Sequence, residues 1–389
     1  MTRATTALAI REHDATVPNR LVEIVAAFTP NWFTVTMGTG VLALNLNQFP
    51  LALPGLHSLA VALWLVNIAL FMLFSLLYAA RFAFFFDGAR RVFGHPVVSM
   101  FFGAIPMGLA TIINGFLAFG EPLLGATAIS IAQALWWLDV ALSLASGLLI
   151  PYLMVTRQEH RLETMTAVWL LPVVAAEVAA ASGALLAAHL PSSDAFLVVI
   201  LSYTLWAYSV PLAMSILVLL FLRLVLHKLP EREMGVSAWL SLGPIGTASL
   251  GLLMLGTAAP AIFTARGLGG VGQVAYGIGL IGGLMFWGYG VWWLGLAMLK
   301  TVRYLREGLP FNLGWWGFTF PLGVYTLATL ALARITQLEV FAVIGGVLAL
   351  CLAALWVMVA VRTVRGAWRG ALFVAPCLQP EAASFARAG

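Results

Sequence analysis

The sequence has 389 residues, of which 62% are hydrophobic and only 9% are charged, and its mean hydropathy is +1.00. This composition excludes a soluble domain and predicts an all-α integral membrane protein. The formal net charge is +5. The basic residues lie in tails, short connections and span ends, so this charge does not indicate binding to nucleic acid.

A window of about 20 apolar residues predicts ten membrane-spanning helices. Connections after even-numbered spans are rich in Lys and Arg, and those after odd-numbered spans hold only Arg266 and Arg334. Because Lys and Arg are enriched on the cytoplasmic side, both termini are predicted to be cytoplasmic, in a multi-pass protein of the plasma or inner membrane. The predicted spans are 24–46, 58–80, 98–119, 126–154, 167–189, 195–226, 238–262, 271–298, 313–333 and 340–362.

These spans divide the chain into three parts. A cytoplasmic N-terminal segment covers 1–22, a ten-helix transport domain covers 23–364, and a cytoplasmic C-terminal tail covers 365–389. From about residue 370 this tail is short and is expected to be disordered.

Five prolines recur in the odd-numbered spans at intervals of 76, 66, 72 and 77 residues. A proline removes a backbone donor and bends a helix. Irregular backbone at membrane depth persists only where it is packed in protein or lines a wet cavity. The pattern therefore predicts five helical hairpins whose broken first helices surround a central pore, although prolines are common in membrane helices in general. The five are Pro30, Pro106, Pro172, Pro244 and Pro321.

Two carboxylic acids lie inside the predicted spans, Asp139 in the fourth and Glu177 in the fifth. A charge at the bilayer centre costs at least about 2.5 kcal/mol, so such acids are candidates for function. Since no basic residue is predicted at similar depth, the hypothesis is that one or both stay protonated and link transport to protons. The alternative is a neutral acid bonded to a neighbouring helix. It is preferred for Asp139, and for Glu177 both interpretations stay open.

Hydroxyl and amide side chains accompany the prolines of the odd-numbered spans. They can hydrogen-bond a solute without a fixed charge, and they can equally satisfy carbonyl groups that a proline leaves free. The second role is preferred for most of them. Glycines in the same spans are predicted to let the helices approach closely. The candidates for polar residues of the pore are Thr39, Thr111, Asn114, Thr247 and Thr319.

Several chemistries find no support in the sequence. Residues 267–272 fit G-x-G-x-x-G, but they join two predicted membrane helices, whereas a dinucleotide site requires a preceding strand. No spacing typical of metal ligands occurs, so neither a metal nor a cofactor is predicted. A membrane-embedded enzyme is the alternative from another class, and it needs an acid and a base at one depth. Only Asp139 and Glu177 are available, on differently placed helices.

Five stretches between residues 28 and 321 resemble, in order, the tellurite-resistance/dicarboxylate transporter family. That family includes fungal malate permeases, fungal sulfite efflux pumps, a bacterial tellurite-resistance channel homologue and plant guard-cell slow anion channels. The resemblance looks closest to the sulfite-efflux branch. The stretches contain Met37-Gly38-Thr39-Gly40, Pro106-Met107-Gly108, Gly243-Pro244-Ile245-Gly246, Trp287-Gly288-Tyr289-Gly290 and Gly314-Trp315-Trp316-Gly317-Phe318-Thr319-Phe320-Pro321.

The resemblance implies five helical hairpins about a quasi-fivefold axis, one pore per subunit and a homotrimer. By motif match, the phenylalanine that obstructs the pore is Phe320, with Phe318 as the alternative if the register slips. The implied solutes are small anions, with sulfite efflux preferred. A C4-dicarboxylate (malate) transporter ranks lower because no fixed cation is apparent in the spans, and a chloride- or nitrate-type channel is a further alternative.

Overall fold

The structure is a computed structural model that describes residues 20–378, and all regular structure in this range is helical. Nine helices in the same range are long and apolar enough to cross a membrane. These findings agree with the predicted all-α, multi-pass membrane protein.

The first predicted span, 24–46, is the exception. It falls on three short elements, α1 (Arg20–Ala27), η1 (Pro30–Phe33) and α2 (Thr34–Asn47). The backbone leaves the helix at Thr29, which is extended, and Pro30 then begins a 3-10 turn. The apolar stretch is therefore divided, and α2 with its 14 residues is too short to count as a crossing by length alone.

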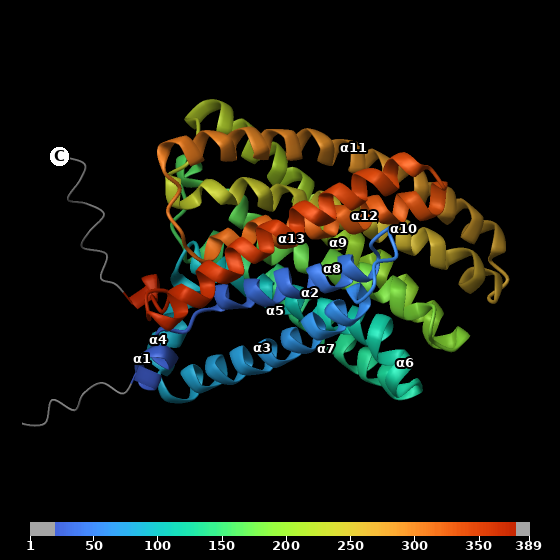
Figure 1. Cartoon of the computed structure of the whole chain (residues 1–389), viewed down its shortest axis with the longest axis horizontal. Helices are drawn as coiled ribbons and strands as arrows, with labels where there is room; N and C mark the ends of the chain where they lie inside the picture. Colours follow the sequence, from blue (N-terminus) through green and yellow to red (C-terminus); the bar gives the residue numbers. More distant parts are fainter. Residues whose placement is uncertain (1–19, 379–389) are drawn as a thin grey trace, which may run out of the picture.

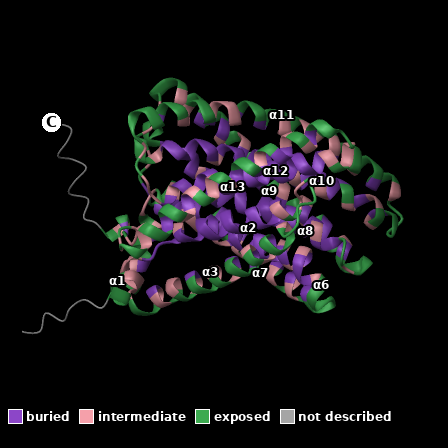
Figure 2. Cartoon of the chain, in the orientation of Figure 1, coloured by how far each residue is buried: buried purple, intermediate pink, exposed green. Residues whose placement is uncertain are grey.

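The remaining long helices alternate in burial along the chain (Figure 2). In the most apolar 18-residue window of each helix, 67–94% of the residues are buried in the inner helices and only 17–39% in the outer helices. The inner helices after α2 are α5 (Ala104–Gly115), α8 (Leu171–Ala187), α10 (Leu242–Thr264) and α12 (Thr319–Thr336). The outer helices are α3 (Leu56–Phe84), α7 (Ala126–Thr156), α9 (Ser192–His227), α11 (Gly269–Glu307) and α13 (Glu339–Trp368).

The five inner helices form a closed ring. Each packs against the next in chain order, and α12 packs against α2. Every outer helix covers the groove between two neighbouring inner helices, for example α3 over α2 and α5, and α13 over α12 and α2 (Figure 1). Short elements complete the fold: α4 (Phe86–Arg90), η2 (Arg91–Gly94), the π-helix η4 (Phe116–Gly120), α6 (Glu121–Leu124), η5 (Leu162–Thr164) and η9 (Pro376–Leu378).

Each inner helix begins as a 3-10 segment and continues as an α-helix. The 3-10 segments before α5, α8, α10 and α12 are η3 (Val98–Gly103), η6 (Ala167–Leu170), η7 (Arg232–Ser241) and η8 (Leu313–Phe318). Pro106, Pro172, Pro244 and Pro321 are the second or third residues of the α segments that follow. There the hydrogen-bond register changes from i−3 to i−4, so a missing N–H coincides with the change in helix type. Pro30 differs, because it begins η1.

Glycines permit the close approach of the inner helices, as predicted. A Cβ atom on Gly40 of α2 would lie 1.9 Å from Oγ1 of Thr111 on α5, and one on Gly38 would lie 2.2 Å from Oγ1 of Thr319 on α12. No side chain larger than hydrogen fits at either position without displacing the neighbouring helix.

The two ends of the described chain meet at one end of the ring. Arg20 donates a hydrogen bond to the carbonyl of Trp368, the last residue of α13. Beyond α13 the chain folds back, so that Ala375 is buried and Cys377 Sγ lies 3.7 Å from Nη2 of Arg81. Helix α13 itself ends at Trp368, four residues past the predicted end of the transport domain at 364. Residues 1–19 of the N-terminal segment and 379–389 of the tail lie outside the described residues.

Candidate functional site

Two cavities lie within the ring of inner helices, one toward each end. The N-end cavity, of about 230 Å³, is lined by residues from the 3-10 segments of all five inner helices and from the first turns of α2, α8 and α12. The C-end cavity, of about 540 Å³, is lined by residues further along all five inner helices. One set of helices therefore encloses both cavities.

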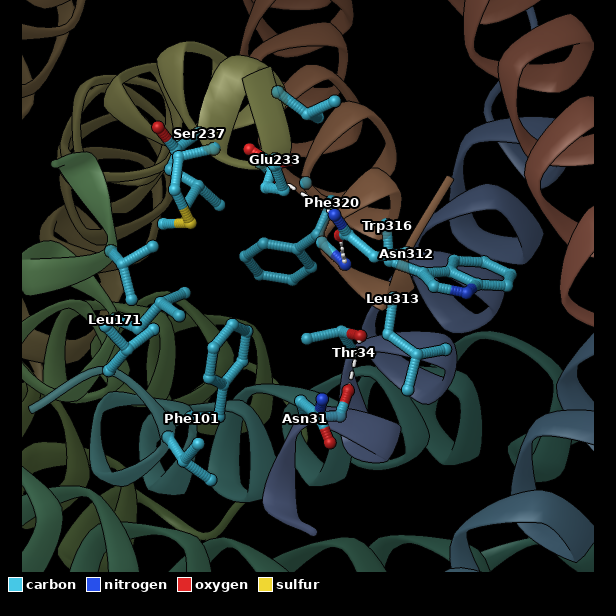
Figure 3. Close-up of a pocket in the computed structure, with 18 of the residues that line it drawn as sticks. Asn31, Thr34, Phe101, Leu171, Glu233, Ser237, Asn312, Leu313, Trp316 and Phe320 are labelled. Carbon is cyan, nitrogen blue, oxygen red and sulfur yellow. Dashed lines mark hydrogen bonds between the residues drawn. The ribbon is translucent and has the colours of Figure 1, made fainter. Parts of the chain in front are cut away.

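The N-end cavity is mainly apolar, and two aromatic rings project into it. Phe320 extends from the first turn of α12 and Phe101 from η3, as Figure 3 shows. Phe320 is only 3% exposed despite lining a cavity, since neighbouring side chains cover it. The polar side chains of the wall are Asn31, Thr34, Glu233, Ser237 and Asn312.

Phe318, the alternative to Phe320, lies elsewhere. Its ring packs edge-on against Trp239, with 5.3 Å between centroids, and against Trp315, with 5.7 Å. It lines neither cavity. Of the two phenylalanines beside Pro321, the structure therefore brings only Phe320 to the axis of the ring.

The two cavities share no lining residue, so a layer of protein separates them. On α12 the lining passes from Pro321 to Leu327, which is about 9 Å at 1.5 Å per residue. On α8 it passes from Leu171 to Ala181, about 15 Å. Helical spacing places buried Val178 in this layer. We call the layer the septum.

The predicted polar residues divide into two groups. Asn114 lines the C-end cavity. The hydroxyls of Thr111, Thr247 and Thr319 instead donate to carbonyl oxygens three or four residues earlier in their own helices, at 2.7 Å, and line neither cavity. Thr39 accepts a 3.2 Å hydrogen bond from Trp356 Nε1 and lines an apolar groove between α3 and α13.

The two membrane acids lie on helices that pack directly against each other, Asp139 on α7 and Glu177 on α8. Trp136 donates to the carbonyl of Ala179, and Ser146 donates to that of Pro172. Because α7 and α8 are antiparallel, these two bonds place both acids in the same slab, that is, at the same level along the two helices. Asp139 and Glu177 are at most 1% exposed, and their carboxyl oxygens form no hydrogen bond with any described residue.

A histidine holds the segment that carries Phe101. Nδ1 of His95 accepts hydrogen bonds from the N–H groups of Val97 and Val98, both at 3.1 Å, and so caps η3. Gln158 braces the same segment by donating to the carbonyl of Phe93 and to Oγ of Ser99. Burial lowers the pKa of His95 below its ordinary value of 6.5, which keeps the ring neutral and able to accept.

Sequence reasoning missed Phe101 and the position of Arg334. Phe101 lies five residues before Pro106 in an apolar run, and nothing local separates it from a lipid-facing phenylalanine. Arg334 stood out as one of two basic residues on its side, but only the structure places it in the C-end cavity. Among the described residues, no group of acidic, histidine and cysteine side chains could hold a metal ion.

Comparison with known proteins bears on this arrangement. The sequence profile of the Voltage-dependent anion channel family matches residues 27–364. The sulfite efflux pump SSU1 of Arthroderma otae is 40% identical over 343 residues, covering 87% of this chain and 91% of that protein. An uncharacterized transporter of Methanocaldococcus jannaschii is 28% identical over 90% of this chain and 97% of its own length. The malic acid transport protein of Schizosaccharomyces pombe is 24% identical over 87% of this chain and 78% of its own length. These matches confirm the resemblance inferred from the motifs.

Proposed function

The chain belongs to the Voltage-dependent anion channel family, and from this premise we propose that it carries small anions across the membrane through its ring of inner helices, with sulfite efflux as its main activity. The observation that carries the proposal is the pair of cavities on one set of five helices, closed from each other by the septum. A closed path of this kind suits a transporter or a gated channel.

The electrostatics of the path favour anions without a basic residue in the N-end cavity. The inner helices begin at this cavity, so the positive ends of their dipoles face a solute that enters there. Such partial charges attract an anion weakly, which allows the release that conduction requires.

Three features of the architecture complete the proposal. The ring is a quasi-fivefold arrangement of five hairpins, in which η1 and α2 supply the tenth crossing. Both termini are cytoplasmic, which agrees with the shared position of Arg20 and Trp368 at one end. The N-end cavity therefore faces the cytoplasm of the cell, in the plasma or inner membrane, and the protein is a homotrimer with one pore per subunit.

We assign the gate of the path to Phe320, because it lines the N-end cavity where the septum begins. Glu177 is proposed as the proton-linked group, with Asp139 as a second candidate for which the structural role is preferred; both acids are buried without partners among the described residues. Contact with the solute stays a prediction for four of the candidate polar residues, Thr39, Thr111, Thr247 and Thr319.

Sulfite is preferred over malate for two reasons. The relatives named as sulfite efflux pumps include chains 39–40% identical to this one, whereas the malic acid transport protein is 24% identical. In addition, a dicarboxylate site calls for two fixed cations, and the described lining of the two cavities holds only one arginine. Malate, chloride and nitrate are the alternative solutes.

The test is anion flux in proteoliposomes containing the purified protein, with sulfite, malate and chloride compared with and without a pH gradient. Sulfite flux well above malate flux is the expected result. Malate flux above sulfite flux would assign the protein to dicarboxylates. Dependence of the flux on the gradient distinguishes proton coupling from passive conduction.

A further inference from the structure

The polar wall of the C-end cavity contains one residue with a permanent charge, Arg334, in the last turn of α12. Asn47, Gln48, Asn114 and His189 supply the other polar side chains. His189 is already engaged, because its Nδ1 lies 3.1 Å from a carboxylate oxygen of Glu121. Among the described residues, the guanidinium of Arg334 forms neither an ion pair nor a hydrogen bond. The side chain of Gln337 donates to the backbone carbonyl of Arg334.

An arginine at the C-terminal end of a helix has an ordinary explanation, since a cation there interacts favourably with the helix dipole. Two observations go beyond it. Of 20 Lys and Arg residues, only Arg266 and Arg334 follow odd-numbered spans. Arg266 stacks over the ring of Phe196, 5.3 Å from its centroid, whereas Arg334 faces the cavity. The guanidinium of Arg334 therefore has no partner among the described residues that would explain a cation at this position.

Asn114 supplies an observation that does not depend on Arg334. Its side chain lines the same cavity, and its buried Oδ1 has no hydrogen-bond partner among the described residues. The amide nitrogen of the same side chain also has no hydrogen-bond partner among the described residues and, unlike Oδ1, it is accessible, so it can donate to a solute in the cavity. A donor that lacks a protein acceptor is suited to an anion.

The helix ends explain why a cation is needed here. The last residues of α2 and the residues just after α8 reach the C-end cavity, and so does the last turn of α12. These helix ends carry negative partial charge and oppose an anion that has passed the septum. The dipoles that favour entry at the N-end cavity thus disfavour exit, unless a positive charge offsets them.

Resting on the proposed function, we propose that Arg334 and Asn114 form an oxyanion-binding site in the C-end cavity, at which a solute is held after it passes the septum. The planar guanidinium offers a fork of two N–H donors that matches two oxygen atoms of one anion. Sulfite and carboxylates present such a pair of oxygens, and chloride does not. The site therefore contributes selectivity for oxyanions over halides.

The test measures sulfite and chloride efflux from proteoliposomes for the wild-type protein, Arg334→Gln, Arg334→Lys and Asn114→Ala. The matched control is Arg266→Gln, which removes the other arginine of this side. Arg334 is exposed, so its substitutions remove no buried contact. Elution of each variant as a single species in detergent checks that it is folded.

Arg334→Gln is expected to lower sulfite flux at low sulfite by about tenfold, which corresponds to about 1.4 kcal/mol. Arg334→Lys keeps the charge without the fork, so it should preserve chloride flux and still lower sulfite flux. Asn114→Ala should lower sulfite flux in the same direction, and Arg266→Gln should match the wild type.

Sulfite flux through Arg334→Gln equal to that of the wild type at every concentration would overturn the site and leave the proposed function standing. Equal losses in Arg334→Gln and Arg266→Gln would also overturn it, by showing a general effect of surface charge. A wild-type protein that passes no more sulfite or chloride than empty liposomes would instead refute the proposed function, and this inference with it.

Discussion

Phe101 and Phe320 project into the same cavity from two different elements, η3 and the first turn of α12. Both rings are apolar and are therefore not fixed by hydrogen bonds. Each lies beside a proline-containing junction between helix types. Movement of either segment changes the width of the path at this level. We therefore propose that the two rings together narrow the path at this level.

Phe320→Ala is expected to raise anion flux by about tenfold, because removal of a barrier of about 1.4 kcal/mol increases a rate by that factor. Phe101→Ala should raise it less, since Phe101 lies five residues before the proline of its helix, Pro106, whereas Phe320 lies directly before Pro321. Flux of sulfite into or out of proteoliposomes checks both. Phe318→Ala is the matched control, because it removes a buried phenylalanine that lines neither cavity. Unchanged flux in a folded Phe320→Ala protein would remove Phe320 as the gate.

Gly40→Ala is expected to destabilise the ring by about 1–3 kcal/mol, the usual cost of overpacking a core. The new Cβ atom would lie 1.9 Å from Oγ1 of Thr111 and 2.5 Å from Nδ2 of Asn67, so α2 and α5 must move apart. Thermal unfolding in detergent measures the effect. Gly277→Ala on α11 is the control, as a Cβ atom there meets no heavy atom within 4 Å. Equal melting temperatures for the two variants would contradict close packing at Gly40.

Glu233→Gln is expected to raise anion flux severalfold at low salt. Glu233 lines both the N-end cavity and the adjacent surface groove, and its carboxylate forms no ion pair with a described residue. Two unit charges 4 Å apart in water interact with about 1 kcal/mol, and salt screens this repulsion. Glu231→Gln provides the comparison, because Glu231 lines only the adjacent surface groove. The increase should shrink at high ionic strength, and an increase that does not depend on salt would point to a steric cause.

The stability of the protein should fall as the pH drops from 7 to 5, in part because of His95. Burial lowers its pKa, so between the lowered value and the ordinary 6.5 the unfolded chain binds a proton that the folded chain does not. Acid then favours unfolding, and protonation of Nδ1 also removes the acceptor that caps Val97 and Val98.

His95→Asn separates this contribution from those of other groups. Asparagine accepts at a helix N-terminus without titrating in this range. Melting temperatures measured from pH 5 to 7 should therefore depend less on pH in the variant than in the wild type. Identical pH profiles for the two proteins would show that His95 keeps its cap when the pH falls.

The fold was predictable where the signal is local. Hydropathy located the nine long apolar helices that lie among the described residues, and the prolines at 106, 172, 244 and 321 marked the starts of inner helices. A proline alone does not mark an inner helix, since Pro151 and Pro211 lie inside the outer helices α7 and α9. What distinguishes the four is their place at a junction of helix types, which depends on the preceding 3-10 segment.

The site was less predictable, because it depends on how helices register against one another. The shared slab of Asp139 and Glu177 follows from bonds between residues 43 and 26 positions apart, at Trp136 and Ser146. No local pattern reveals those partners. The threonines illustrate a second reason: a hydroxyl that can reach a solute can also bond its own helix, and Thr247 does so.

Glu177→Gln tests the link to protons most directly. The carboxyl group is buried without a partner among the described residues, so a neutral amide of the same shape fits with little loss of stability. If Glu177 takes up and releases a proton during transport, the variant should still pass sulfite down its gradient, but a pH gradient should no longer change the rate. Asp139→Asn is the companion variant, for which we expect the response to the gradient to persist, since the structural role is preferred for Asp139. Flux in proteoliposomes with and without the gradient decides this, and a Glu177→Gln protein that responds to the gradient like the wild type would exclude proton coupling through Glu177.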